Sequence, residues 1–240
     1  MNDLPVSTKW LIDSIGESGR KLISSVFMVL SKKTNEKGTG FLYREQYVIT
    51  NWHVIKDSRP EELLIRSGFG EEFSVIKIVV DKNRDLALLS LNGHITEGSL
   101  EIDTTSEIKP GLQVSTWGFP LAYNGPSPLL SVGHIAGFRE HREANSLPII
   151  KRIVVNGAFN PGNSGGPLFV SGNNKVVGVV VSKHVPFTPF LLSSLDVLAK
   201  NQSGVVFTGR DEAGNERNFV ESQIVAELLN HFRVLTQVMI

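Results

Sequence analysis

The feature that most restricts the fold of this chain is a series of a dozen short apolar or β-branched runs along its 240 residues. Gly, Asn, Pro or charged residues bound each run, and these residues favour turns. Such close connections indicate antiparallel sheets, because parallel strands need long crossover connections. The expected strands are residues 25–30, 40–42, 47–50, 63–66, 72–80, 87–91, 113–117, 131–138, 149–155, 167–170, 176–182 and 204–207.

The series divides in the middle, where the polar sequence SEIKPG begins at Ser106. Half of the expected strands precede this linker and half follow it. We therefore predict an all-β fold of two antiparallel six-stranded β-barrels, over residues 23–105 and 113–210 of a single domain that spans 1–240.

Helices are expected outside the barrel strands. A short N-terminal helix is predicted in an extension of residues 1–22, where apolar residues recur at helical spacing after a Ser-Thr pair. A second is predicted at 189–200, inside an insertion at 184–203, because a proline stands at its first position. A C-terminal helix is predicted over 218–238, where apolar residues repeat every three or four positions.

The composition excludes several classes of partner. Lys and Arg total 24 against 24 Asp and Glu, so no net field attracts nucleic acid or an anionic membrane surface. The absence of cysteine excludes disulfides and thiolate metal sites, and the histidines show no paired ligand spacing. We therefore expect no metal, no cofactor, no nucleic acid and no membrane partner.

The N-terminal region bears on the location of the protein. Its longest apolar run, residues 22–30, follows acidic residues, lacks a small-residue cleavage site and is too short to span a membrane. Because this run is a poor signal peptide, we expect a soluble cytoplasmic protein. A leader that is missing from the given sequence is the alternative.

A serine among glycines is the strongest functional signal, in the sequence PGNSGGPL that begins at Pro161. Glycines permit a tight turn that leaves the hydroxyl of Ser164 clear of the backbone and directs nearby N–H groups at the oxygen of a tetrahedral intermediate. A nucleophilic serine needs that arrangement. An ordinary Gly-rich hairpin is the alternative interpretation of the same residues.

Two further residues could complete a catalytic set. His53 follows an expected strand in the sequence YVITNWHV, and Asp85 stands just before the apolar run LALL. A histidine can serve as a general base, and a carboxylate can orient it. Taken singly, a packed or surface histidine and a turn aspartate are the simpler interpretations of these two positions.

Together, these segments resemble one family. The motifs GTGF, VITNWHV, RDLALL, WGFP, SVGHIAGF and NPGNSGGPL occur in the order seen in trypsin-like serine peptidases, and the sequence is most similar to the HtrA (Deg) branch. The resemblance covers residues 25–208. It implies a chymotrypsin-like double barrel and a serine endopeptidase that cleaves a protein or peptide through an acyl-enzyme. It also implies a catalytic triad of His53, Asp85 and Ser164.

The resemblance implies roles for neighbouring residues as well. Backbone N–H groups of Gly162 and Ser164 would form the oxyanion hole. Ala158 stands where an Arg/Lys-specific relative has an aspartate, so a substrate cation would lack a counter-charge and small or medium apolar residues would be preferred before the scissile bond. Simple core filling is the alternative for Ala158. The substrate-binding residues expected on these grounds are Ala158, Phe159, Asn160, Gly204, Val205 and Val206.

Two departures from the HtrA branch limit the resemblance. Nothing after the last expected barrel strand corresponds to the PDZ domains typical of that branch, so we expect a peptidase domain without them. The insertion at 184–203 is either a lid or partner-docking element or a packing insertion.

A catalytically idle peptide-binding or scaffolding module of the same fold is the alternative to a peptidase. Processing of one dedicated protein partner is a further hypothesis.

Overall fold

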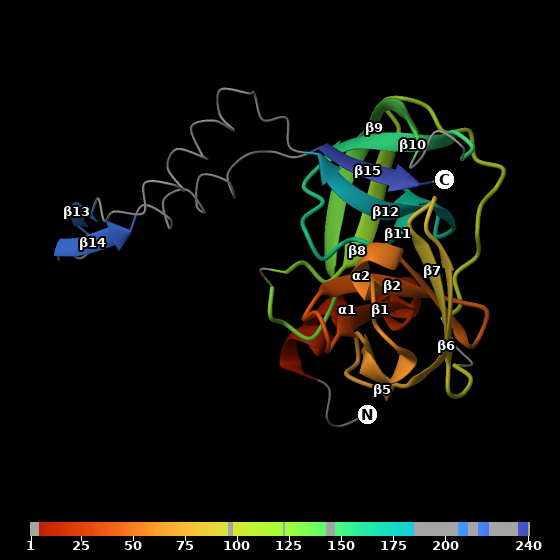
Figure 1. Cartoon of the computed structure of the whole chain (residues 1–240), viewed down its shortest axis with the longest axis horizontal. Coiled ribbons are helices and arrows are strands. Elements are labelled where there is room, and N and C mark those ends of the chain that lie inside the picture. The colour runs from red at the N-terminus through yellow and green to blue at the C-terminus, as the bar shows by residue number, and fades with distance from the viewer. Residues whose placement is uncertain are drawn as a thin grey trace. The chain divides into compact units, whose positions relative to one another are not determined.

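A computed structural model of the chain divides it into two compact units, Met1–His184 with Leu235–Ile240, and Val185–Val234. The described part of the second unit is an antiparallel pair of strands, β13 (Val206–Arg210) and β14 (Glu216–Val220). Side chains are described up to position 181, except at 17 and 18. The described residues are 5–95, 98–121, 123–142, 147–184, 206–210, 216–220 and 235–239 (Figure 1).

The first sheet of the larger unit is built from seven antiparallel strands (Figure 1). Their spatial order is β5-β4-β1-β2-β3-β7-β6, and the sheet curls so that β6 also contacts β4. The strands are β1 (Val26–Ser31), β2 (Lys37–Tyr43), β3 (Tyr47–Thr50), β4 (Leu63–Ser67), β5 (Glu72–Phe73), β6 (Val75–Asp81) and β7 (Leu86–Leu91).

Alternation of apolar side chains gives this sheet its own core. In β7, Ala87, Leu89 and Leu91 point inward, and none is more than 3% exposed. Phe27 from β1 and Leu42 from β2 belong to the same buried cluster. This period of two is the expected pattern for a strand with one buried face.

The second sheet closes into a barrel of six antiparallel strands, in the order β10-β15-β12-β11-β8-β9. Its core includes Val114, Ile135, Ile153 and Leu168, each at most 1% exposed. The strands are β8 (Gln113–Gly118), β9 (Leu129–His141), β10 (Ile150–Gly157), β11 (Pro167–Val170), β12 (Val176–His184) and β15 (Leu235–Met239).

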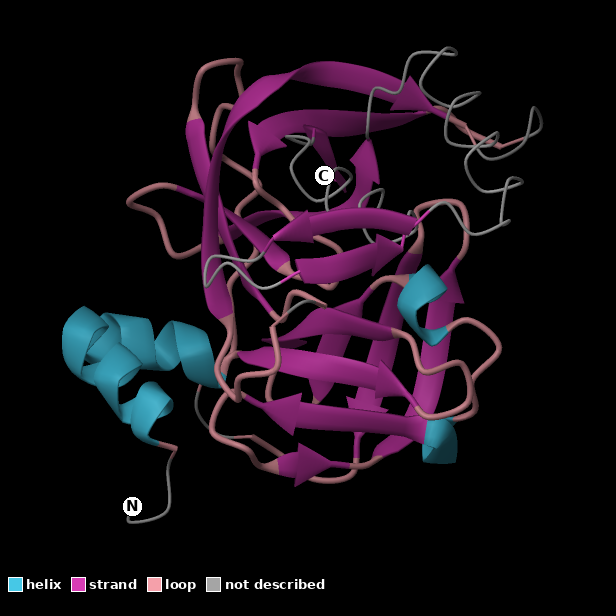
Figure 2. Cartoon of the chain, turned by 90° about the vertical axis from the view of Figure 1, so that its left-hand side faces the viewer, coloured by secondary structure: helices cyan, strands magenta, loops and turns pink. Residues whose placement is uncertain are grey.

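A third buried cluster joins the two barrels. Val26 and Phe41 come from the first barrel, and Trp117, Phe169 and Val179 come from the second; none is more than 9% exposed. Figure 2 shows the two groups of strands, in magenta, stacked along one direction. Because this cluster fixes one barrel against the other, side chains from both can converge on one site.

The short N-terminal helix is confirmed as α1 (Val6–Ser24), with a break in the helical backbone at Gly16, where φ is 66°. The helix is attached to the second barrel through Thr8, which is fully buried and whose hydroxyl lies 2.6 Å from that of Ser127. Two shorter helical segments follow in the first barrel, α2 (Trp52–Ile55) and a 3-10 turn at Pro60–Glu62. Within the described residues, no helix has the length and apolar character to cross a bilayer.

The all-β double barrel is confirmed, with seven strands in the first sheet and six in the second rather than six in each. The helix predicted over 218–238 is wrong at both ends, because 218–220 belong to β14 and 235–238 to β15. β15 lies between β10 and β12, where tertiary pairing outweighs the helical periodicity read from the sequence. Residues 221–234 lie outside the described residues.

The strand predicted at 204–207 is not the last strand of the second barrel. β13 begins at Val206 and pairs with β14 in the smaller unit, whereas β15 closes the barrel. The predicted helix at 189–200 lies outside the described residues. So does the insertion at 184–203, apart from His184, which ends β12.

Candidate active site

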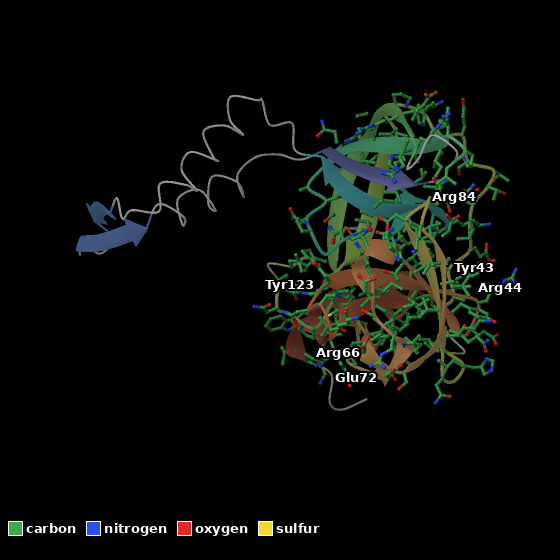
Figure 3. All side chains as sticks on the ribbon, in the orientation of Figure 1. Tyr43, Arg44, Arg66, Glu72, Arg84 and Tyr123 are labelled. Atoms are coloured by element: carbon green, nitrogen blue, oxygen red, sulfur yellow. The ribbon has the colours of Figure 1, made fainter. Side chains whose placement is uncertain are left out.

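The turn between β6 and β7 presents Asp85. Within it, Arg84, labelled in Figure 3, donates from its guanidinium (2.8 Å) and its backbone N–H (3.0 Å) to the carboxylate of Asp81. These hydrogen bonds, the guanidinium contact above all, lower the pKa of Asp81. Asp85 follows with a φ of 55°, a left-handed conformation that aspartate adopts more readily than most residues. A fixed turn therefore sets the direction of the Asp85 side chain.

The carboxylate of Asp85 contacts His53 at two points. Its Oδ1 accepts a hydrogen bond from the backbone N–H of His53 at 2.8 Å, and its Oδ2 lies 2.6 Å from the ring Nδ1. An ionised carboxylate can only accept, so Nδ1 carries the proton and Nε2 is the basic nitrogen. The His53 side chain is 43% exposed and that of Asp85 only 16%. The imidazole is thus oriented by a shielded partner while it remains open to solvent.

Backbone contacts fix the start of the helix that carries the histidine. α2 begins where β3 ends, and the carbonyl of Asp85 accepts hydrogen bonds from the Trp52 N–H at 3.1 Å and the Asn51 side-chain amide at 2.9 Å. The same aspartate therefore positions both the helix and the ring.

Ser164 lies between β10 and β11, on a loop whose carbonyl groups accept hydrogen bonds from nearby N–H groups. The carbonyl of Pro161 accepts from the Leu121 N–H at 2.8 Å, and that of Asn163 accepts from the Gly166 N–H at 2.9 Å. A trans peptide points its N–H away from its C=O. These two bonds therefore set the directions of the N–H groups one residue further along, at positions 162 and 164.

The N–H groups of Gly162 and Ser164 find no acceptor among the described residues. Gly162 has a φ of 96°, and a Cβ there would lie 2.4 Å from the carbonyl oxygen of Phe119, so this position requires glycine. Two unpaired donors with fixed peptide planes thus stand on either side of Asn163. These are the two N–H groups that the resemblance to trypsin-like peptidases predicts for an oxyanion hole.

Two glycines let the serine loop approach the histidine helix. A Cβ on Gly165 would lie 3.0 Å from the backbone nitrogen of Asn51, the residue before α2. A Cβ on Gly38 would lie 2.6 Å from Val54 in α2 and 3.1 Å from the carbonyl oxygen of Ser164. Only a backbone without side chains allows the two elements to pack this closely.

The serine hydroxyl and the imidazole are not hydrogen-bonded in this structure. Ser164 Oγ donates to the carbonyl of Val181 at 3.4 Å, and no hydrogen bond joins it to His53 among the described residues. The structure therefore brings His53 and Asp85 together and places Ser164 across Gly38 from α2, without the bond between the serine and the histidine.

The predicted substrate-binding residues separate into three groups. Ala158 and Asn160 are exposed beside the serine loop. Phe159 is 1% exposed and packs in the core of the second barrel. Gly204 and Val205 lie outside the described residues, and Val206 begins β13 in the smaller unit. Their proposed roles remain predictions.

Two contributors to the loop were not identified from the sequence, Thr39 and the segment from Phe119 to Leu121. Thr39, Phe119 and Pro120 lie in motifs that supported the resemblance and Leu121 follows one, yet no role followed from their residue types. The sequence feature that could have identified these two contributors is the glycine next to each of them. A Cβ on Gly118 would lie 2.6 Å from Asn163 Oδ1 and 2.9 Å from Thr39 Oγ1, and glycine within a strand often marks such an approach.

The chemistry available here is acyl transfer. A basic imidazole nitrogen, a serine hydroxyl and two unpaired backbone N–H groups supply a base, a nucleophile and anion-stabilising donors. No group of three or more His, Cys, Asp or Glu side chains in the described part of the chain could hold a metal ion.

The double barrel, with a His–Asp pair on one barrel and a serine among glycines on the other, defines the chymotrypsin-like class of proteins. The model of the trypsin-like peptidase domain matches residues 38–179, more than half of the chain. The chain therefore belongs to the trypsin-like peptidase family.

Curated relatives share this region at moderate identity. A probable periplasmic serine endoprotease DegP-like from Pseudomonas fluorescens is 32% identical over 149 residues, which is 62% of this chain and 29% of the relative. Protease Do-like 1, chloroplastic, from Arabidopsis thaliana is 28% identical over 62% of this chain and 34% of its own length. This chain thus spans about a third or less of the length of these relatives.

Solved structures share the fold. The Rv3671c protease from M. tuberculosis in its active form is 21% identical, with a TM-score of 0.59 over 73% of this chain and 80% of that chain. A structure of the inactive form gives a TM-score of 0.58, with 22% identity over 75% of this chain and 90% of that chain.

The expectation of a cytoplasmic location is wrong. Several of the relatives are named probable periplasmic endoproteases. The error arose because a poor signal peptide was taken as evidence of location, although it reports only on the residues at the start of the given sequence.

Proposed function

We propose that this chain is a serine endopeptidase in which Ser164 is the nucleophile, His53 the general base and Asp85 the residue that orients the base. The observation that carries the proposal is the double contact of the Asp85 carboxylate with the backbone and the ring of His53. One carboxylate orients both the imidazole and the helix that bears it, which is the role of the aspartate in a catalytic triad. Its contact with Nδ1 leaves Nε2 as the basic nitrogen.

The reaction follows from these positions. His53 Nε2 takes the proton of the Ser164 hydroxyl while Oγ bonds to the carbonyl carbon of the scissile peptide. The carbonyl oxygen becomes an oxyanion, which accepts hydrogen bonds from the N–H groups of Gly162 and Ser164. The C–N bond then breaks, and the imidazolium returns its proton to the leaving amine. Water repeats the sequence on the acyl-enzyme and restores the hydroxyl.

The site needs one local adjustment to react. In this proposal, the Ser164 hydroxyl leaves the carbonyl of Val181 and turns toward the imidazole before it reacts. Catalytic hydrogen bonds are often absent in unliganded sites and form when substrate binds.

The test is labelling with a fluorophosphonate probe and hydrolysis of casein. Wild-type protein should label at Ser164 and cleave casein, whereas Ser164→Ala should lose labelling and fall on the order of 10⁶-fold in kcat. Ser171→Ala is the matched control, because Ser171 is an exposed serine on the turn after β11. Folded wild type that neither labels nor cleaves contradicts the proposal.

That last result would favour the alternative, a catalytically idle peptide-binding module. The observation in its favour is the position of the Ser164 hydroxyl, directed at Val181 rather than at His53. Peptide binding without turnover, unchanged in Ser164→Ala, is the result that this alternative predicts.

For specificity, we propose a preference for small or medium apolar residues before the scissile bond. No carboxylate occurs in residues 157–163, and Ala158 is exposed beside the loop. A buried substrate cation would therefore lack a counter-charge. Profiling of a proteome-derived peptide library, with Ser164→Ala as background, tests this; dominant cleavage after Lys or Arg would refute it.

The substrates we propose are proteins outside the cytoplasm, one of which is a dedicated partner. The support for the location is the naming of several relatives as periplasmic endoproteases, whereas the dedicated partner remains a hypothesis from the sequence. Fractionation of the natural source with an antibody against this chain tests the location, and recovery in the cytoplasmic fraction alone contradicts it.

A further inference from the structure

The loop that carries Ser164 depends on a side chain of the first barrel. Thr39, in β2, is fully buried. Its Oγ1 donates to the carbonyl of Gly162 at 2.6 Å and accepts from the N–H of Phe119 at 3.0 Å. Because the incoming bond from Phe119 fixes the orientation of the hydroxyl, its proton is directed at Gly162.

The backbone of Thr39 is engaged as well. Its N–H donates to the carbonyl of Ser164 at 2.8 Å, and its own carbonyl accepts from the hydroxyl of Thr50 at 2.7 Å. Every polar group of Thr39 is therefore used, and two of its bonds go to the loop on either side of Asn163. A buried residue with all its hydrogen bonds satisfied is held in one place.

This arrangement bears on Gly162 in particular. With no Cβ and a φ of 96°, Gly162 has more conformational freedom than its neighbours. Leu121 fixes the peptide before it, through the carbonyl of Pro161, and Thr39 fixes the peptide after it. With both planes held, the N–H of Gly162 has one direction.

We propose that Thr39 is a positioning residue for the oxyanion hole. The first barrel thus supplies the base and also a hydroxyl that holds the peptide after Gly162, so that the oxyanion donor, whose own peptide is held by Leu121, stays fixed on the second barrel. The inference rests on the proposed function, because it assigns a means of positioning to the same site. Thr39 touches neither substrate nor reacting atoms, and it acts through Gly162.

The experiment compares Thr39→Val with Thr39→Ser. Valine keeps the shape of threonine but can neither donate to Gly162 nor accept from Phe119, whereas serine can do both. Hydrolysis of a succinylated trialanine p-nitroanilide should lose about 10- to 100-fold in kcat in Thr39→Val, with little change in KM, since a misdirected donor costs less than a deleted one. Thr39→Ser should recover most of the rate.

A second readout separates positioning from simple packing. Inhibition by a trialanine boronate depends on the oxyanion hole, because the tetrahedral adduct places an oxygen there. The inhibition constant should rise in Thr39→Val by the same factor as kcat/KM falls. The control is Thr116→Val, since Thr116 is equally buried and its one hydroxyl hydrogen bond within the described part of the chain is a long one, 3.4 Å to the carbonyl of Trp117.

The outcomes are distinct. Full kcat in folded Thr39→Val, or an equal loss in Thr116→Val, overturns the inference while the proposed function stands. Inert wild-type protein, without labelling by fluorophosphonate, overturns both. If Thr39→Val does not fold, Thr39→Ala replaces it, because alanine leaves space beside the Phe119 N–H, and the same kinetic split then decides.

Discussion

In the first barrel, one residue positions another. The Asp85 carboxylate contacts His53 directly, and the backbone carbonyl of Asp85 accepts hydrogen bonds from the two residues that precede His53. In the second barrel, several bonds that hold the serine loop go to its carbonyl groups, and one of the donors is a side chain of the first barrel, Thr39. The first half of the site thus depends on the chemical identity of one residue. The second depends on backbone conformation.

Among the residues that position the base or the oxyanion donors, and apart from Ser164 itself, we expect the largest loss in the first half. Asp85→Asn keeps the size of the side chain but presents an amide to Nδ1, which favours the wrong tautomer of His53. We expect kcat to fall about 10⁴-fold. Steady-state hydrolysis of casein measures it, and Asp81→Asn is the control, because Asp81 contacts Arg84 in the same turn and not the histidine. A loss of the same size in Asp81→Asn would show that the turn matters, rather than the carboxylate.

In the second half, Gly162→Ala tests the backbone. The new Cβ would meet Phe119 O at 2.4 Å and Leu121 N at 2.7 Å, so the loop must move and its donor with it. We expect kcat to fall about 10²- to 10³-fold, the cost of one oxyanion donor. Gly172→Ala is matched to it, since Gly172 has a φ of 82° and no atom within 4 Å of an added Cβ.

The control variant separates strain from function. Gly172→Ala should lose about 1 kcal/mol of stability from its left-handed backbone and keep full activity. Urea unfolding and casein hydrolysis of both variants test this pair. Equal activity in the two would contradict the role given to the Gly162 backbone.

A third variant addresses the contact between the halves. In Gly38→Ala, the added Cβ would separate Val54 of α2 from the carbonyl of Ser164, which lie 2.6 Å and 3.1 Å from it. A displacement of about 1 Å between base and nucleophile costs about 10²-fold in rate. Gly137→Ala, with nothing within 4 Å of its Cβ, should be neutral in the same assay. Unchanged kinetics in Gly38→Ala would mean that the two halves tolerate separation.

The smallest effect is expected between the barrels, away from both halves. Asp103 accepts hydrogen bonds from Ser106, Thr105 and Asn173, and those from the Ser106 hydroxyl and Thr105 hold its pKa well below the ordinary 3.8. The folded pKa is depressed, so this stabilisation is complete above 3.8 and is lost as the pH falls through the folded value. Urea unfolding of wild type and Asp103→Asn should converge at acid pH, with activity at neutral pH unchanged. A stability difference that persists in acid contradicts this.

The sequence was a good guide to the elements that repeat a simple pattern. The alternating apolar residues of β7 predicted a strand, the PGNSGG sequence predicted a tight turn, and the ordered motifs indicated the family. It was a poor guide where non-local pairing decides, as in β15, whose residues continue a helical spacing but lie between β10 and β12.

The role of Thr39 was hidden for a related reason. Its partners in the second barrel, Gly162, Phe119 and Ser164, lie 80 or more positions away along the chain; the nearest of them, Phe119, is 80 positions from Thr39. No local pattern encodes such contacts. The direct bond of His53 to Asp85 was inferred only because ordered motifs resembled a known family.

The position of β15 has a consequence for the order in which the protein matures. The Gly165 N–H donates to Val180 in β12, and β12 pairs along its other edge with Leu235–Met239. Until a ribosome has added residues 235–239, β10 and β12 have no neighbour between them and the barrel beneath the serine remains open. Biosynthesis therefore completes the scaffold of the nucleophile well after the histidine and the aspartate have emerged.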